Sequence, residues 1–156
     1  MSELDSNDLK ILALLQQNGT LGARELAEHI NLSPSPCWRR VKRLEDAGVI
    51  DRYVAVLNAA PLGLSATAYV HVSLVDHSEA TITSFDQFVQ EQEQVIECSS
   101  ITGDSDYVLK VVAPDAEGLE NFMMKRLLAL GVVRASRTNF VLRQAKNSTA
   151  LPLEFA

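Results

Sequence analysis

The stretch Leu32–Glu45 reads LSPSPCWRRVKRLE and decides how the fold is interpreted. Ser33-Pro34 and Ser35-Pro36 each offer a serine N-cap followed by proline, which favours a helix that begins here and is stopped by Gly48. On a helical wheel of about 100° per residue, the inner face is apolar: Cys37, Val41 and Leu44. The outward side is polar and basic: Ser35, Trp38, Arg39, Lys42 and Arg43, with Arg40 on the flank.

This basic surface stands out in an acidic chain, which has 14 Lys+Arg against 20 Asp+Glu in 156 residues, a net charge of −6. Arg and Lys neutralise phosphates, bidentate Arg suits guanine in the major groove, and serines at a helix N-terminus suit phosphate. The pattern therefore indicates binding to double-stranded DNA, with Arg40 on a phosphate. The candidate DNA-binding residues are Ser33, Ser35, Pro36, Trp38, Arg39, Arg40, Lys42 and Arg43.

Two residues of this helix keep a second interpretation open. Trp38 either faces DNA or packs against the first domain's core or a neighbouring chain. The wheel places Cys37 inward, as a small buried hydrophobe. As a thiol switch, Cys37 would need a lowered pKa, which Arg39 and Arg40 could supply if they reach the sulfur.

Two shorter helices are predicted before the basic one. The second has apolar residues at the spacing of one helical face: Ala23, Leu26, Ala27 and Ile30. The first has a stripe in which Asp8 is the polar exception: Leu4, Asp8, Ile11, Leu12 and Leu15. Asp5 or Ser6 can cap its start. Together with the tight turn Asn31–Ser33, these helices predict a helix-turn-helix.

After Gly48 the hydrophobic period changes to two, which predicts a strand over Ile50–Leu57. The segment Asn58–Gly63 breaks the pattern and is the expected domain boundary. We therefore divide the chain into a DNA-binding domain, 1–60, and a second domain, 61–156. The tail Gln144–Ala156 has no assigned element.

The second domain alternates strands and helices. Strands are predicted at Thr67–Val75, Val95–Ile101, Tyr107–Val112 and Val132–Arg143. One helix is marked by Ile82, Phe85 and Val89, and another begins at Pro114-Asp115. The order β-α-β-β-α-β fits a ferredoxin-like split βαβ sandwich, so the fold class is α+β. Apolar residues on the sheet face without helices would drive dimer formation.

Several motifs resemble one family. Leu32–Glu45 is similar to the recognition-helix signature of the Lrp/AsnC (feast/famine) transcriptional regulators, and further motifs match in the same order along nearly the whole chain. These are Leu4-Asp5-x-x-Asp8-x-x-Ile11-Leu12, Gly48-Val49-Ile50-x-x-Tyr53, Glu97-Cys98, Thr102–Lys110 and Pro114-Asp115.

The resemblance implies a winged helix-turn-helix joined to a βαββαβ module that binds an effector and oligomerises. It implies dimers that assemble into octamers or similar rings, and a small-molecule effector, usually an amino acid, held between dimers. The loop that matches the effector site is Thr102, Gly103, Asp104, Ser105 and Asp106. Asp106 is the residue expected to respond to ligand. Ser105 stands where the leucine-responsive branch has an aromatic residue, so leucine is not singled out.

Taken without the family, residues 102–106 are an ordinary hairpin turn. Its exposed backbone N–H groups can bind a carboxylate, and Asp104 or Asp106 can pair with an ammonium group. An α-amino acid carries both charges, so the chemistry is coherent.

Other classes of protein are excluded or disfavoured. Cys37 and Cys98 are the only cysteines, and they are too far apart, with scattered histidines, to suggest a metal site or a disulfide framework. No nucleotide-binding, P-loop or nucleophile motif occurs. No apolar run approaches the roughly 18 residues of a membrane span, and the acidic start is unlike a secretory signal. We expect a cytoplasmic protein with no catalytic residue, metal or cofactor and no membrane partner.

The sequence therefore predicts a sequence-specific transcriptional regulator that responds to a small effector. One alternative is an architectural protein that wraps DNA with little sequence choice. The other is an amino-acid-sensing regulatory subunit, since small βαββαβ modules also serve that purpose.

Overall fold

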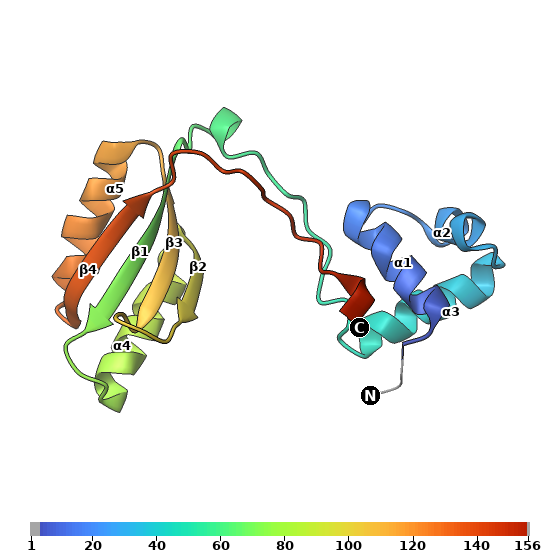
Figure 1. Ribbon diagram of the computed structural model, residues 1–156, viewed down its shortest axis with the longest axis horizontal. Helices are drawn as coiled ribbons and strands as arrows, with labels where there is room; N and C mark the ends of the chain where they lie inside the picture. The colour runs from blue at the N-terminus through green and yellow to red at the C-terminus, as the bar shows by residue number, and fades with distance from the viewer. Residues whose placement is uncertain (1–3, 156) are drawn as a thin grey trace. The chain divides into compact units, whose positions relative to one another are not determined.

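The computed structural model describes residues 4–155 (Figure 1), so part of the acidic start lies outside the described residues. The chain forms two compact units. The helical unit contains the residues up to Val56 and those from Lys146 onward, and the sheet unit is Leu57–Ala145. This division differs from the expected ranges 1–60 and 61–156, because the final residues belong with the helical unit.

The helical unit is built on α1 (Ser6–Gln17), α2 (Ala23–Ile30) and α3 (Pro34–Asp46). Asp5 caps α1 by accepting hydrogen bonds from the backbone N–H groups of Asn7 and Asp8. Gly48, at φ +69°, follows α3 in a left-handed conformation that favours glycine. The buried core is apolar, as the helical periods predicted: Ile11, Leu12, Leu26, Ala27, Ile30, Cys37, Val41 and Leu44.

The C-terminal tail is anchored to α1. The Gln16 side-chain amide donates to the Leu151 carbonyl at 3.2 Å, and its oxygen accepts from the Leu151 N–H at 2.6 Å. Leu153, in the short 3₁₀ turn Leu153–Phe155, packs against the core of the helical unit. No sequence pattern predicted this contact.

The predicted strand Ile50–Leu57 is wrong. Residues 51–57 are exposed and have no regular secondary structure, with Val54 and Val56 at 68% and 70% exposure. A strand needs a neighbour for its backbone groups, and the described part of this chain offers none to the segment. The alternating hydrophobic pattern of a strand is present, but no neighbouring strand pairs with it in the described part of the chain.

The sheet unit has the predicted order of elements. They are β1 (Ala66–Leu74), α4 (Glu79–Glu91), β2 (Val95–Ser100), β3 (Tyr107–Ala113), α5 (Ala116–Phe122) and β4 (Val133–Phe140). A π-helical turn, Met123–Leu127, and a 3₁₀ turn, Leu128–Leu130, extend α5. The strand order is β2-β3-β1-β4, and all neighbours are antiparallel. This arrangement confirms the α+β class and the split βαβ topology, in which β3 lies between β1 and β2.

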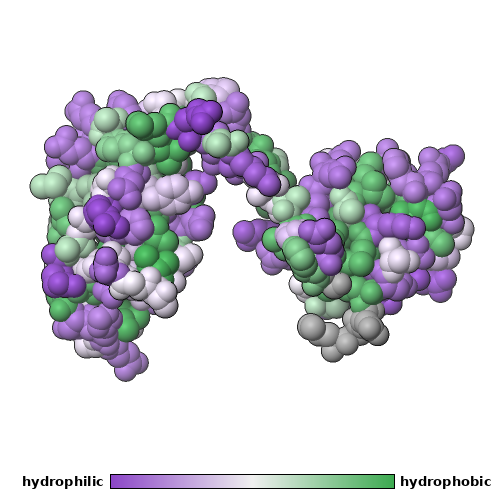
Figure 2. Space-filling model, viewed as in Figure 1, coloured by the Kyte–Doolittle hydropathy of each residue, from purple (hydrophilic) through white to green (hydrophobic). Residues whose placement is uncertain are grey.

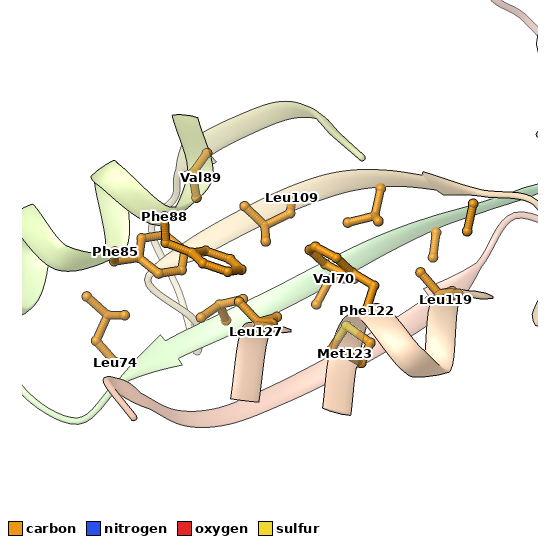
Figure 3. Packing of buried hydrophobic residues seen from close by; sticks show 14 residues of the cluster. Val70, Leu74, Phe85, Phe88, Val89, Leu109, Leu119, Phe122, Met123 and Leu127 are labelled. Atoms are coloured by element: carbon orange, nitrogen blue, oxygen red, sulfur yellow. The ribbon is translucent and has the colours of Figure 1, made fainter. Parts of the chain in front are cut away.

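One face of the sheet carries the core (Figure 3). Phe85, Phe88 and Val89 from α4 meet Leu119 and Phe122 from α5 over the strands. The inward residues of β1 are those predicted from its alternation: Ala68, Val70, Val72 and Leu74.

The opposite face is mixed in character. Tyr69 pairs with Lys110 and Asn139 on the neighbouring strands, and His71 pairs with Val108 and Arg137. Figure 2 also shows hydrophilic and hydrophobic residues intermixed over the visible surface of the sheet unit. An assembly through this face would therefore combine polar with apolar contacts. In the described chain, 4–155, no helix is both long and apolar enough to cross a membrane.

Candidate functional site

The predicted faces of the basic helix are those observed in α3. Cys37, Val41 and Leu44 are buried in the helical unit. The outward residues are exposed: Ser35, Trp38, Arg39, Lys42 and Arg43. Trp38 is 54% exposed, so it does not fill the core of its own unit. Ser33 is the N-cap residue, but its hydroxyl makes no capping hydrogen bond and is open to other partners.

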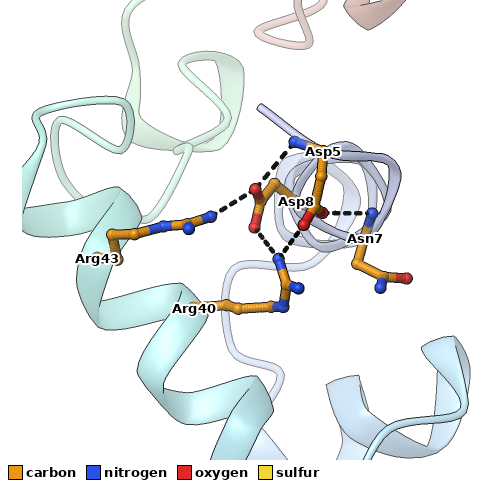
Figure 4. Close-up of polar contacts among 5 residues, drawn as sticks. All are labelled: Asp5, Asn7, Asp8, Arg40 and Arg43. Atoms are coloured by element: carbon orange, nitrogen blue, oxygen red, sulfur yellow. Dashed lines mark hydrogen bonds and ion pairs between the residues drawn. The ribbon is translucent and has the colours of Figure 1, made fainter. Parts of the chain in front are cut away.

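Asp8 explains the polar exception in the first stripe (Figure 4). Its side chain is 0% exposed and lies between α1 and α3. Asp8 Oδ1 accepts from Arg40 Nη1 at 2.9 Å, and Asp8 Oδ2 accepts from Arg43 Nη2 and from the backbone N–H of Asp5. Two arginines that the sequence assigned to DNA therefore neutralise a buried carboxylate.

Asp5 adds a second carboxylate to this cluster. Arg40 Nη1 also donates to Asp5 Oδ2 at 2.6 Å, and Asp5 is about half exposed. The backbone N–H of Asp8, followed by the Arg40 guanidinium, lowers the pKa of the Asp5 carboxyl. The hydrogen bonds to Asp5 and then to Asp8 raise the pKa of Arg40.

The remaining basic residues differ in their partners. Lys42 pairs with Glu45 at 3.5 Å and Asp46 at 3.1 Å, both on its own helix. Arg39 makes no ion pair or side-chain hydrogen bond within residues 4–155. A hollow of about 360 Å³ is lined by Pro36, Arg39, Arg40 and Arg43. This surface can receive an anion, and Arg39 is the arginine that can do so without giving up an internal partner.

Cys37 lacks the electrostatics of a reactive thiol. Burial raises its pKa, and the opposing effect of Arg40 is smaller. A raised pKa keeps the sulfur as a thiol at neutral pH, whereas a thiol switch needs the thiolate. The interpretation of Cys37 as a buried hydrophobe is therefore favoured.

The predicted effector loop is a turn between β2 and β3. Gly103 has φ +120°, which a side chain would disfavour. Asp106 Oδ2 accepts from the Leu74 N–H at 2.8 Å, and Asp106 Oδ1 lies 2.9 Å from His77 Nε2. These contacts, that with His77 foremost, lower the pKa of Asp106. Asp106 therefore joins the loop to the end of β1, a role that the sequence did not predict.

His77 is the residue near this loop that sequence reasoning missed. It lies in the β1–α4 connection, and its side chain is 69% exposed. Asp104 is exposed, and its backbone carbonyl accepts from the Ser73 hydroxyl at 3.4 Å. A second hollow is lined by residues of α4: Glu79, Ala80, Thr83, Ser84 and Gln87.

Together, the two units define a class of protein. A helix-turn-helix with an exposed basic third helix, joined to a separate antiparallel βαββαβ unit, is the architecture of a transcriptional regulator with its own ligand-binding domain. The comparison with family models agrees: residues 4–51 match the winged helix-turn-helix DNA-binding model, and residues 67–151 match the Lrp/AsnC ligand-binding domain. The chain belongs to the Lrp/AsnC family of transcriptional regulators.

Individual relatives resemble the chain over almost its full length. It is 36% identical to the DNA-binding transcriptional activator DecR of Escherichia coli, over 97% of this chain and 99% of that protein. It is 38% identical to the leucine-responsive regulatory protein of Rhizobium meliloti, over 94% of each. A transcriptional regulator of Neisseria meningitidis, solved in complex with L-methionine, has a TM-score of 0.95 at 37% identity, covering 98% of this chain and 99% of that one.

Proposed function

We propose that α3 is the helix that enters the major groove, with Ser35, Trp38 and Arg39 directed at the bases. Lys42 and Arg43 face the DNA beside them, Arg40 binds a phosphate, and Ser33 and Pro36 contact the backbone at the helix start. The observation that carries this proposal is Arg39, an exposed arginine on the basic side of α3 that has no side-chain partner among residues 4–155. An unpaired guanidinium can form the bidentate contact with guanine at no cost to the fold.

We further propose that the sheet unit binds an amino acid at Thr102–Asp106. The L-methionine complex of the Neisseria meningitidis relative supports this class of effector. Because Asp104 and the neighbouring residues Thr102 and Gly103 are exposed, a second chain could cover the loop and complete the site. Ligand binding would then be coupled to assembly, because a ligand held between chains favours the assembled state.

The proposed assembly is a homodimer that forms an octamer or a similar ring. Two surfaces support it. Segment 51–57 exposes apolar side chains and has no regular secondary structure, and the sheet face around Tyr69 and His71 mixes polar with apolar residues. Sedimentation equilibrium measures the mass directly, and a strictly monomeric protein would contradict this part of the proposal.

DNA binding is tested by selecting duplexes from a random library and measuring affinity against salt. A dimer that neutralises about 6–8 phosphates should give a slope of log affinity against log salt of roughly −5 to −7. Equal affinity for all duplexes would favour the architectural alternative. Absence of DNA binding with intact ligand binding would favour the regulatory-subunit alternative.

Effector binding is tested by thermal shift with each proteinogenic amino acid. A ligand at 100 times its Kd adds about 2.7 kcal/mol to the free energy of unfolding, which is readily seen. Asp106→Ala should abolish the shift. His77→Ala is the matched control, because it removes the same ion pair but leaves the carboxylate in place.

A further inference from the structure

One guanidinium nitrogen serves two carboxylates that differ sharply in accessibility. Arg40 Nη1 donates to Asp8 Oδ1 and to Asp5 Oδ2. The Asp8 side chain is 0% exposed, whereas that of Asp5 is 49% exposed. Asp8 is thus a permanent partner, because a charge cannot remain buried alone. Asp5 can leave Arg40 and be hydrated at little cost.

The two carboxylate oxygens of Asp5 have separate roles. Oδ1 accepts the backbone N–H groups of Asn7 at 2.9 Å and Asp8 at 3.0 Å, which caps α1. Oδ2 faces Arg40. The contact with Arg40 can therefore be lost while the helix cap is kept.

The charges of the cluster balance as long as Asp5 stays in place. Two carboxylates, Asp5 and Asp8, face two guanidiniums, Arg40 and Arg43. The arginine-lined hollow lies beside this cluster. While Asp5 stays in place, the net charge of the cluster is zero and its attraction for an incoming phosphate is weak. Once Asp5 has turned away, the net charge of the cluster is +1 and the attraction is stronger.

We propose that Asp5 is an internal competitor for a DNA phosphate at Arg40. In the free protein Asp5 Oδ2 holds the guanidinium, and on binding a backbone phosphodiester replaces it in the hollow formed by Pro36, Arg39, Arg40 and Arg43. Asp5 thereby lowers affinity for DNA of any sequence and leaves discrimination to the residues that contact bases. This inference rests on the proposed function of α3.

Asp5→Asn isolates the competing charge. Asparagine is as good an N-cap residue as aspartate, so its carbonyl oxygen keeps the helix cap while an amide replaces Oδ2. We expect binding to a labelled duplex of mixed sequence to tighten roughly three- to fivefold at low salt. The gain should shrink as salt rises, and it should be the same for selected and unrelated duplexes.

Two variants with the same change of charge serve as controls. Asp115→Asn replaces the N-cap residue of α5 in the sheet unit, and Glu28→Gln removes an exposed carboxylate of the helical unit. Both should leave affinity close to that of the wild type. Asp5→Ser, which keeps an N-cap side chain, repeats the test should the asparagine variant be unstable, and thermal unfolding checks both.

Each outcome has a distinct meaning. Folded Asp5→Asn and Asp5→Ser proteins that bind DNA no more tightly than the controls would overturn the inference and leave the proposed function standing. A gain confined to one duplex would also overturn it, because a phosphate competitor acts on every sequence. A wild-type chain that binds no duplex would overturn the proposed function and this inference together.

Discussion

Arg40 and Asp8, which are 32 positions apart in the sequence, are joined by an ion pair of 2.9 Å between the third helix and the first. Arg43, one turn further along α3, binds the other oxygen of the same carboxylate. The position of α3 against α1 is therefore set by a buried charge as well as by apolar packing. A charge with two fixed partners specifies one arrangement of the helices, which packing of similar aliphatic side chains does less strictly.

Replacement of Asp8 by alanine should destabilise the helical unit. Breaking a buried ion pair costs about 3–5 kcal/mol, but the two arginines left behind are partly exposed. We therefore expect a loss on the order of 2–3 kcal/mol. Hydrogen exchange of the α1 and α3 amides measures this loss within the helical unit. Asp51→Ala, at an exposed position, is the control, and equal protection in the two variants would contradict the role given to Asp8.

Arg39→Ala should weaken binding to a selected duplex by about 1–3 kcal/mol and relax base preference at one position. Arg39 has no internal partner among residues 4–155, so the fold should be unaffected. Fluorescence anisotropy with matched and mismatched duplexes separates the two effects. Arg24→Ala, which removes an exposed arginine of α2, should change affinity little. A uniform loss on all duplexes would show that Arg39 contacts phosphate instead of a base.

The Asp106 contacts predict a pH dependence in the sheet unit. His77 and the Leu74 N–H lower the pKa of Asp106 below its ordinary value of 3.8. The folded state thus favours the carboxylate, and its stabilising effect is present above pH 3.8 and lost as pH falls through the lowered value.

Wild-type protein should therefore exceed Asp106→Asn in stability at neutral pH, and the difference should narrow in acid. Thermal unfolding across a pH series measures it. Asp104→Asn, which removes an exposed carboxylate of the same loop, is the control variant. A stability difference between wild type and Asp106→Asn that stays constant as the pH falls would contradict a stabilising role of the Asp106 carboxylate.

Cys37 should resist alkylation in the native protein. Its side chain is buried, so the reagent cannot reach the sulfur, and its raised pKa keeps the sulfur in the unreactive thiol form. We expect iodoacetamide to modify Cys37 slowly at neutral pH and rapidly after addition of urea, with the site identified by mass spectrometry. Fast native modification accompanied by loss of DNA binding would restore the thiol-switch hypothesis.

Most of the fold could be predicted from the sequence because the buried face of a helix or strand appears as a regular spacing of apolar residues. Ala23, Leu26, Ala27 and Ile30 repeat at helical spacing, and three of the four are buried in α2. The alternation of Ala68, Val70 and Val72 is that of a strand covered on one face. Capping residues such as Asp5 also act on their immediate neighbours, so the start of α1 was predictable.

The segment 51–57 shows where the spacing of apolar residues is insufficient to predict secondary structure. Its alternating pattern is that of a strand, yet a strand also needs hydrogen-bonding partners that no short stretch of sequence can supply. The tail was equally unpredictable, because Leu153 packs on residues well over a hundred positions earlier. Neither the missing strand partner nor the contact of the tail produces a periodic pattern in the sequence.

The sequence by itself determined the order of the elements, the apolar faces that they bury and the basic outer side of α3, because side-chain periodicity depends only on local backbone geometry. The tertiary structure alone decided which charged residues are available to a ligand. The sequence assigned Arg39, Arg40 and Arg43 all to DNA, and the structure shows that Arg40 and Arg43 also bind Asp8 of α1. It likewise shows that the Asp106 carboxylate contacts the Leu74 N–H and His77. Ion pairs form between residues that folding brings together, and the separation of two residues in the sequence does not tell whether they will meet.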